Sequence, residues 1–393
     1  MGISANQRYK QLDSLRGVAA LVVVLGHLYL TVNDDGVSGL FRTPLSPFVT
    51  GPAAVVLFFV LSGFVLSLPY ASGRGRRYLA YAVGRLCRLY LPLLATVILS
   101  AALAWTFAGA APPPALTQTF RTWNLPLSAD NLVSHLALSG YPLDATRLDP
   151  PMWSLIMEVR ASLLFPALFF FVWRFGLASV AAGLIVAFLC VRLKTSLGDP
   201  STVDARDLIG TLLLTGRYLV FFLMGIACAL RLDDLRAIYG KLTPALHVAA
   251  CGAGVLIATM LAISGKASGG SAYLFYGCSA VYVISGCLFS QGASRLLQRP
   301  WPSWLGQVSF SLYLIHWPVI LTAFYIVAPR IGAGPALILA FPMVLLAAHG
   351  MERWVERPTH NLGKWCARRL DPPPAVDLKT GEVGPGRGRP GAA

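Results

Sequence analysis

Ten apolar runs, each close to the length that crosses a bilayer, constrain this chain more than any other feature. A helix needs about 20 mainly apolar residues to cross about 30 Å of hydrocarbon. The runs cover residues 15–32, 49–68, 89–108, 153–173, 176–191, 208–230, 244–264, 272–289, 304–327 and 335–352. The sequence therefore predicts an all-α integral membrane protein with about ten transmembrane helices.

The charged residues are too few and too scattered for a soluble or a nucleic-acid-binding protein. They make up 12% of the 393 residues, while 56% are hydrophobic; a soluble domain carries about 25% charged residues. The formal net charge of +15 would suit nucleic acid, but the lysines and arginines lie between the apolar runs instead of forming one basic stripe. We therefore expect the lipid bilayer, and no nucleic acid, as a partner.

Seven cysteines, at positions 87, 190, 228, 251, 278, 287 and 366, lie scattered and mostly inside apolar runs. They form neither a CxxC motif nor a pair with histidine, which are the patterns of redox and zinc sites. The sequence therefore predicts neither a disulfide framework nor a metal site.

The positive charges predict how the chain crosses the membrane. With the N-terminus in the cytoplasm, the inside segments hold 21 lysines and arginines and the outside loops hold eight, and cytoplasmic segments are the ones enriched in these residues. Both termini are therefore expected in the cytoplasm, in a multi-pass protein of the cell (inner or plasma) membrane. No small-residue cleavage site follows the first run, which predicts a retained helix.

Two regions lie outside the apolar runs. Residues 109–152 form a long loop that we expect on the outside, over the outer mouth of the bundle. Residues 371–393 are rich in proline and glycine and predict a disordered cytoplasmic tail. The prediction is thus one membrane domain, residues 1–370, followed by this tail.

Ionisable side chains inside the runs are the candidates for function, because a charge in the bilayer is costly unless it faces a cavity or a partner. In the first run, His27 follows Arg16 by eleven residues. Eleven residues make three helical turns plus about 20°, so both side chains lie on one face, about 16 Å apart. The structural alternative is an arginine that extends to the headgroups and a histidine bonded to a neighbouring helix.

Two short motifs follow. The pair Ser62-Gly63, among aromatic residues of the second run, lets another helix or a ligand chain approach the backbone closely. Arg85 and Arg88 continue the basic loop ahead of the third run, and their guanidinium groups, three residues apart, suit phosphate oxygens. Helix packing and the charge bias of membrane topology are the respective alternatives.

Later runs carry polar stripes, in which residues recur every three or four positions and so share a helix face. The stripes are Ser154, Glu158 and Ser162 in the fourth run, Ser309, Tyr313 and His316 in the ninth, and His349, Glu352 and Glu356 at the end of the tenth. Arg160 points nearly opposite to Glu158. The stripes predict side chains around one cavity, although a structural hydrogen-bond ladder or ion pair explains each of them equally well.

Together these residues resemble the acyltransferase family 3 of integral-membrane O-acyltransferases, which acylate sugars, lipids and antibiotics. The resemblance covers residues 10–360 and rests on five motifs in the family's order. They are Arg-x10-His (Arg16, His27), Phe-Phe-x-x-Ser-Gly-Phe (Phe58 to Phe64), Arg-x-x-Arg (Arg85, Arg88), Trp-Ser-Leu-x-x-Glu (Trp153 to Glu158, with Phe165-Pro166) and Ser-x-Tyr-x-x-His (Ser311, Tyr313, His316). One departure is Ala161-Ser162, where many members carry Phe-Tyr.

The resemblance implies ten membrane helices, acyl-CoA as the cytoplasmic donor and no permanently bound cofactor. The reaction would transfer an acetyl or other short acyl group to a hydroxyl of a sugar, glycan, glycolipid or similar acceptor. Such a hydroxyl needs a base, for which imidazole is suited; we expect His27 as the base and Glu158 to orient it, with His316 as the rival base. We also expect Arg16, Ser62, Arg85 and Arg88 to contact acyl-CoA, and Trp153, Ser154, Tyr313 and His316 to line the substrate path.

Two other classes of protein compete with the enzyme. A multi-span transporter or exporter of a polar or lipid-linked substrate would use the in-membrane Arg, His and Glu as a path, although the repeated halves and broken helices of such proteins are not visible. A non-catalytic assembly or sensor protein would tolerate a neutral replacement of His27. Acyl transfer by the purified protein distinguishes the enzyme from both.

Overall fold

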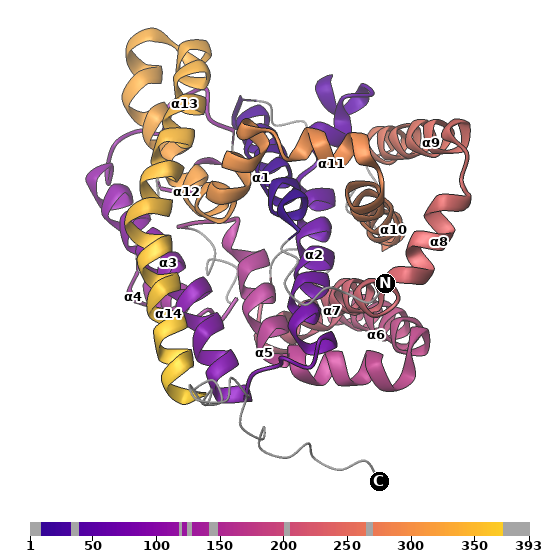
Figure 1. The fold of residues 1–393 in the computed structure, drawn as a ribbon. Coiled ribbons are helices and arrows are strands. Elements are labelled where there is room, and N and C mark those ends of the chain that lie inside the picture. Colours follow the sequence, from indigo (N-terminus) through magenta and orange to yellow (C-terminus); the bar gives the residue numbers. More distant parts are fainter. Residues whose placement is uncertain are drawn as a thin grey trace.

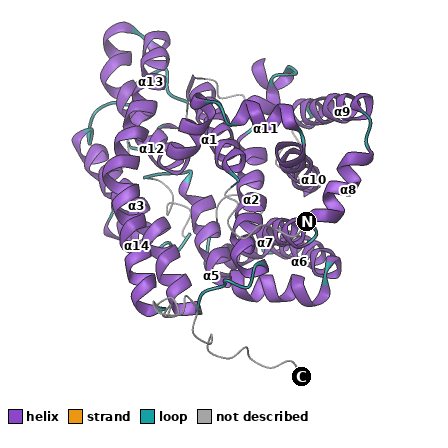
Figure 2. Cartoon of the chain, viewed as in Figure 1, coloured by secondary structure: helices purple, strands orange, loops and turns teal. Residues whose placement is uncertain are grey.

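The computed structural model describes residues 9–32, 39–117, 120–123, 128–140, 148–199, 205–264 and 270–371, and every regular element within them is helical (Figure 1, Figure 2). The long helices are α1 (Lys10–Val32), α2 (Gly51–Ala71), α3 (Tyr78–Thr106), α5 (Met152–Phe175), α6 (Leu177–Ser196), α7 (Leu208–Leu230), α9 (Pro244–Ile263), α10 (Gly270–Phe289), α12 (Pro300–Ile331) and α13 (Ala333–Met351). The shorter ones are α4 (Ala129–Leu136), α8 (Leu232–Lys241), α11 (Gln291–Leu297) and α14 (Arg357–Leu370), and a π-helical turn, Glu352–Glu356, joins α13 to α14. The predicted disordered tail, beyond Asp371, lies outside the described residues.

Ten helices of the described chain are long and apolar enough to cross a membrane, which confirms the predicted number. They are the ten long helices, the last of which continues from α13 through the π-helical turn into α14. The predicted division between the fourth and fifth runs is also confirmed. Gly176 separates α5 from α6 with φ of +59°, a conformation that glycine adopts without a Cβ clash.

Glycines bring the central helices into backbone contact. A Cβ on Gly17 of α1 would lie 2.4 Å from the backbone carbonyl carbon of Leu305 on α12. A Cβ on Gly225 of α7 would lie 2.0 Å from the carbonyl oxygen of Val60 on α2. Lipid is as apolar as the helices themselves, so close packing of this kind holds membrane helices together. The glycines therefore fix the crossings around which the site is built.

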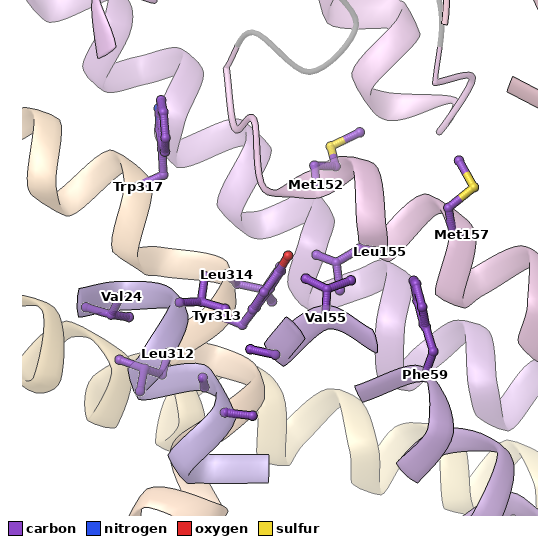
Figure 3. Packing of buried hydrophobic residues seen from close by; sticks show 14 of the residues in the cluster. Val24, Val55, Phe59, Met152, Leu155, Met157, Leu312, Tyr313, Leu314 and Trp317 are labelled. Carbon is purple, nitrogen blue, oxygen red and sulfur yellow. The ribbon is translucent and has the colours of Figure 1, made fainter. Parts of the chain in front are cut away.

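The buried core lies where α1, α2, α5, α7 and α12 meet. Its largest fully buried side chains include Phe59, Tyr218 and Trp317. Figure 3 shows Phe59 and Trp317 on separate helices, with other buried side chains of the core between them. In contrast, α6 and α9 lie at the edge of the bundle (Figure 1), and only 11% of the apolar window of each is buried. Such exposed apolar faces are the surfaces that contact lipid acyl chains.

Two helix bounds differ from the sequence prediction by ten residues or more. The third spanning helix begins at Tyr78, well before residue 89, so Arg85 and Arg88 lie inside the spanning helix α3 and not ahead of it. The last one extends far beyond residue 352, to Leu370 at the end of α14. Both extensions are polar on the side that faces a cavity, which is why hydropathy alone ended the runs too early.

Candidate active site

A cavity of about 620 Å³ lies among the spanning helices, lined by residues from the start of α1 and from the start of α5. Helices α1, α2, α3, α5, α12 and the α13–α14 segment line it. Seven of the ten predicted site residues line this cavity, namely Arg16, Ser62, Arg85, Arg88, Ser154, Glu158 and Tyr313, whereas His27, Trp153 and His316 do not. The structure therefore brings most of the predicted residues together in one space.

The cavity runs from an exposed rim to a buried end. At the rim lie Arg357, Asn361 and Lys364 of α14, all three exposed. At the other end lie Ser154 and Tyr313, both buried. A ligand that fills the cavity would therefore have one end among basic groups near solvent and the other end in the protein core.

A chain of hydrogen bonds crosses the middle of the cavity. The hydroxyl of Ser62 donates to Oε1 of Glu158 at 3.1 Å and accepts from the guanidinium of Arg16 at 3.5 Å. The same carboxylate oxygen lies 3.5 Å from a guanidinium nitrogen of Arg85, which also donates to the hydroxyl of Ser162 at 2.8 Å. Four helices thus contribute to one network, and the carboxylate balances the positive charge that the arginines concentrate there.

The stripe on α5 lies as its spacing predicts. Ser154, Glu158 and Ser162 face the hydrogen-bond network and the cavity. Arg160, on the opposite face, donates to the hydroxyls of Thr211 and Thr215 on α7 at 2.8 and 2.9 Å. Arg160 therefore joins α5 to α7 and does not reach the cavity.

Tyr313 closes the buried end of the cavity. Its hydroxyl lies 2.6 Å from the Ser154 hydroxyl and donates to the carbonyl oxygen of Pro151 at 3.1 Å, and its ring packs edge-on against Phe58. Figure 3 shows the ring beside Val55, with the hydroxyl directed towards the start of α5. These contacts hold the ring between the cavity and His316, against which the ring packs edge-on.

Behind Tyr313, two imidazoles form a hydrogen-bonded pair. The Nδ1 atom of His27 on α1 lies 2.8 Å from Nε2 of His316 on α12. Their planes are 6° apart and their centroids 5.0 Å apart, the geometry of two rings bonded edge to edge in one plane. His316 is fully buried, while His27 is partly exposed and packs against Trp317 and Phe120.

The surroundings of His316 decide which nitrogens of the neutral pair carry protons. Nδ1 of His316 lies 2.8 Å from the carbonyl oxygen of Tyr313 and 3.2 Å from that of Leu312. Carbonyl oxygens only accept, so Nδ1 is the protonated nitrogen and Nε2 accepts the Nδ1–H of His27. The Nε2 lone pair of His27 is then unprotonated and available as a base.

The contacts of two predicted site residues, Glu158 and Trp153, differ from those that were expected. Glu158 contacts Ser62 and Arg85, and the hydrogen-bond partner of His27 is His316, so the structure does not bring Glu158 and His27 into the expected contact. Trp153 packs against Tyr218, with ring centroids 5.3 Å apart, and not along the cavity. The helix stripe of Ser154 and Glu158 excluded Trp153 from the same face, because neighbouring residues differ by 100° in direction.

Several cavity residues escaped prediction. Arg357, His360, Asn361 and Lys364 lie on α14, which follows the last apolar run. Their signal is the recurrence of polar residues at positions 357, 360, 361 and 364, which share one helix face. Glu356, from the predicted stripe, accepts a hydrogen bond from the Ser311 hydroxyl at 2.6 Å and so ties this segment to α12.

The end of the long loop 109–152 packs into the bundle beside α5. The amide of Leu148 donates to Nε2 of His135 at 3.0 Å, and Nδ1 of His135 donates to the carbonyl oxygen of Asn131 at 2.6 Å. Asp149 is fully buried, and neither of its carboxylate oxygens has a hydrogen-bond partner in the described chain. Burial therefore raises the pKa of the Asp149 carboxyl well above its usual range. Asp144 lies outside the described residues.

Among the described residues, no group of three or more His, Cys, Asp or Glu side chains is arranged to hold a metal ion.

Comparison with known proteins assigns the chain to a family. A sequence model of the acyltransferase domain matches residues 9–350, from the start of α1 to the end of α13. No curated protein and no solved structure matches the chain. Because the match covers nearly the whole membrane bundle, the chain belongs to the acyltransferase family 3 and is a multi-pass membrane protein of that family.

Proposed function

We propose that this protein transfers an acetyl or other short acyl group from acyl-CoA to a hydroxyl of a sugar, glycan, glycolipid or similar acceptor. The observation that carries the proposal is the position of Tyr313. Its side chain forms the buried end of the arginine-lined cavity, and its ring also packs against His316, the partner of His27. The cavity arginines, which are suited to bind phosphate, and the imidazole pair, which is suited to accept a proton, thus lie on two sides of the Tyr313 ring.

The base in this proposal is Nε2 of His27. An acceptor hydroxyl must lose its proton as it attacks a thioester, and imidazole accepts a proton near neutral pH. His316 has both ring nitrogens engaged, one with backbone carbonyls and one with His27. His316 is therefore the positioning residue, which holds the His27 ring in one tautomer and one orientation.

The step is a single displacement. The acceptor hydroxyl donates its proton to Nε2 of His27 while its oxygen attacks the thioester carbonyl carbon. The new carbon–oxygen bond forms, the carbon–sulfur bond breaks, and CoA leaves as a thiolate that takes the proton from the imidazolium. The base is regenerated, so the proton balance closes within one turnover.

The arginines supply the donor contacts in this proposal. Guanidinium groups bind phosphate oxygens with charge-assisted hydrogen bonds, and Arg16, Arg85 and Arg88 all line the cavity. Glu158 and Ser62 hold two of these three arginines in place. The donor would lie with its nucleotide towards the rim and its acyl group at Tyr313.

The donor side is the cytoplasm in this proposal, and the membrane is the cell (inner or plasma) membrane. The cavity lining includes Asp13 and Arg16 at the start of α1, and the 21 to eight distribution of lysines and arginines supports a cytoplasmic location for this end of the cavity. The partly exposed side chain of His27, farther along α1, supports approach of the acceptor from the opposite side of the membrane.

The test combines cells with purified protein. Mass spectrometry of surface glycans and lipids, from cells with and without the gene, should detect an ester-linked acyl group only when the gene is present. Purified protein in nanodiscs should then release CoA from acetyl-CoA in the presence of the lysate fraction that contains the modified acceptor. Movement of a polar or lipid-linked substrate without any ester formation would contradict the proposal and identify a transporter.

A further inference from the structure

The rim of the cavity is formed by a helix outside the predicted spans. On α14, Arg357, His360 and Lys364 are spaced by three and four residues and all line the cavity. That spacing places them on one face of the helix, along about 10 Å of its length. Arg357 and Lys364 are exposed, so this basic face meets solvent at the cavity mouth.

The position of this face is fixed by close packing of α14 on α3. A Cβ on Gly363 would lie 2.9 Å from the Cβ of Cys87 and 3.1 Å from the carbonyl oxygen of Gly84. At the end of the helix, a carboxylate oxygen of Asp371 accepts the backbone N–H of Arg77 at 3.0 Å. Lys364, next to Gly363, lines the same cavity as Arg85 and Arg88 of α3.

The cations along the cavity differ in their partners. The carboxylate of Glu352 neutralises Arg357 at 2.5 Å, and that of Glu158 lies 3.5 Å from Arg85. Within the described residues, Lys364 has no carboxylate within 4.0 Å. An exposed ammonium without an internal counter-ion, at the mouth of a cavity, is suited to a terminal phosphate, which it binds as a point charge.

We infer that the cavity face of α14 binds the phosphate groups at the nucleotide end of the acyl donor, and that Lys364 binds its ribose phosphate. The inference rests on acyl-CoA being the donor. A thioester directed to Tyr313 leaves the nucleotide of CoA at the rim, where its ribose 3′-phosphate is the phosphate group farthest from the acyl carbon. Arg357 and His360 then lie beside the diphosphate, deeper in the cavity.

The same phosphate chemistry also occurs in lipid headgroups, and α14 offers a control that separates the two. Arg368 is an exposed cation of the same helix that does not line the cavity. An anionic bilayer would attract both cations, because attraction to a charged surface depends on charge and not on the direction of one side chain. Of these two cations, only Lys364 would contribute to binding of a donor in the cavity.

The experiment compares CoA with dephospho-CoA, which lacks only the ribose 3′-phosphate. Binding to the full-length chain in phosphatidylcholine nanodiscs is measured by calorimetry for the wild type, Lys364→Ala and Arg368→Ala. We expect the wild type to prefer CoA about tenfold, as loss of one charge-assisted phosphate contact predicts. Lys364→Ala should lose this preference and bind dephospho-CoA as the wild type does, while Arg368→Ala should keep it.

Each of the other outcomes leads to a different conclusion about Lys364, the lipid headgroups or the donor. Wild-type binding of CoA without preference, or equal weakening of both ligands by Lys364→Ala, would overturn the role of Lys364 and leave acyl-CoA as the donor. A Lys364 effect that appears only in nanodiscs with anionic lipid would assign the face to headgroups. Failure of the wild type to bind either ligand would refute the proposed donor, and this inference with it.

Discussion

His27 and His316, from the first and the ninth spanning helices, share one hydrogen bond of 2.8 Å between Nδ1 and Nε2. The backbone carbonyls beside His316 fix the direction of this bond, because they accept only from a protonated Nδ1. The pair therefore resembles a base with its orienting partner, a role in which carboxylates are more familiar. Unlike a carboxylate, the neutral imidazole of His316 adds no charge to the core.

His27→Ala should abolish acyl transfer while the protein still folds and binds its donor. Loss of a general base costs a factor of about 10² to 10⁴ in rate. Single-turnover transfer and donor binding are measured separately, at matched membrane abundance, with Glu158→Gln compared alongside. A His27→Ala rate above about a tenth of wild type, well short of that loss, would show that His316 or another group is the base.

His316→Ala should lower kcat by about 10², the cost of a misplaced reacting group, with little change in donor KM. His316→Gln should recover part of the rate, since its amide oxygen is able to accept the Nδ1–H of His27. The pH dependence of kcat should also shift in His316→Ala, because the His27 base would lose the partner that fixes its tautomer. Equal rates and pH profiles for the alanine and glutamine variants would mean that His316 acts only in packing.

Arg85→Ala with Arg88→Ala should raise the donor KM at least about tenfold, because two charge-assisted phosphate contacts disappear. Arg74→Ala with Arg76→Ala is the control, since it removes the same charge from the preceding loop and not from the cavity. Kinetics with acetyl-CoA in nanodiscs distinguish the two variants. If both double variants behave alike, the arginines of α3 serve topology.

Gly225→Val should prevent correct folding, because its side chain would overlap the carbonyl oxygen of Val60, 2.0 Å from the Cβ position. Gly254→Val on α9 is the matched control, since a Cβ there meets nothing within 4 Å. Size-exclusion profiles and thermal melting in detergent compare the two. A wild-type melting curve for Gly225→Val would show that the crossing of α2 and α7 is looser than described.

Asp149→Asn should stabilise the protein near neutral pH. Burial raises the folded-state pKa of Asp149, whereas the unfolded carboxyl keeps its ordinary value, so deprotonation favours the unfolded chain as pH rises between the two. The amide removes this dependence. Melting temperatures at about pH 7 and about pH 4 should differ between variant and wild type only at the higher pH. A lower melting temperature for Asp149→Asn at pH 7 would contradict the assignment.

Both termini should lie in the cytoplasm, as the charge bias predicts. Asp130→Cys, at an exposed position of α4 in an otherwise cysteine-free chain, should react with an impermeant maleimide added outside intact cells. A cysteine placed in the tail 371–393 should react only after permeabilisation. The reverse labelling pattern would invert the topology and move the donor to the outer side.

The spanning helices were predictable because every helix face that is exposed to lipid has to be apolar. Helices such as α6 and α9 are apolar almost all round, and hydropathy finds them without knowledge of their neighbours. The same measure missed the first turns of α3 and the whole of α14, where polar residues face a cavity. Errors in the bounds therefore fell where the protein holds its charged groups.

The site was predictable in part, for a related reason. Helical spacing placed Ser154 and Glu158 on one face, since that face depends only on local geometry. The contact between His27 and His316 joins positions 289 residues apart, and it depends on how α1 crosses α12. Gly17 permits that crossing, but a glycine does not indicate which helix it will meet.

The closure of the cavity by Tyr313 has a consequence for how much donor would be lost to hydrolysis. With the Tyr313 hydroxyl held by Ser154 and Pro151, a thioester bound in the cavity as proposed would be shielded from the imidazole that would activate water as readily as a sugar. The proposed enzyme would then hydrolyse little acyl-CoA in the absence of acceptor as long as the ring stays in place. Transfer would require the Tyr313 ring to move, so that little of the donor is lost between productive encounters.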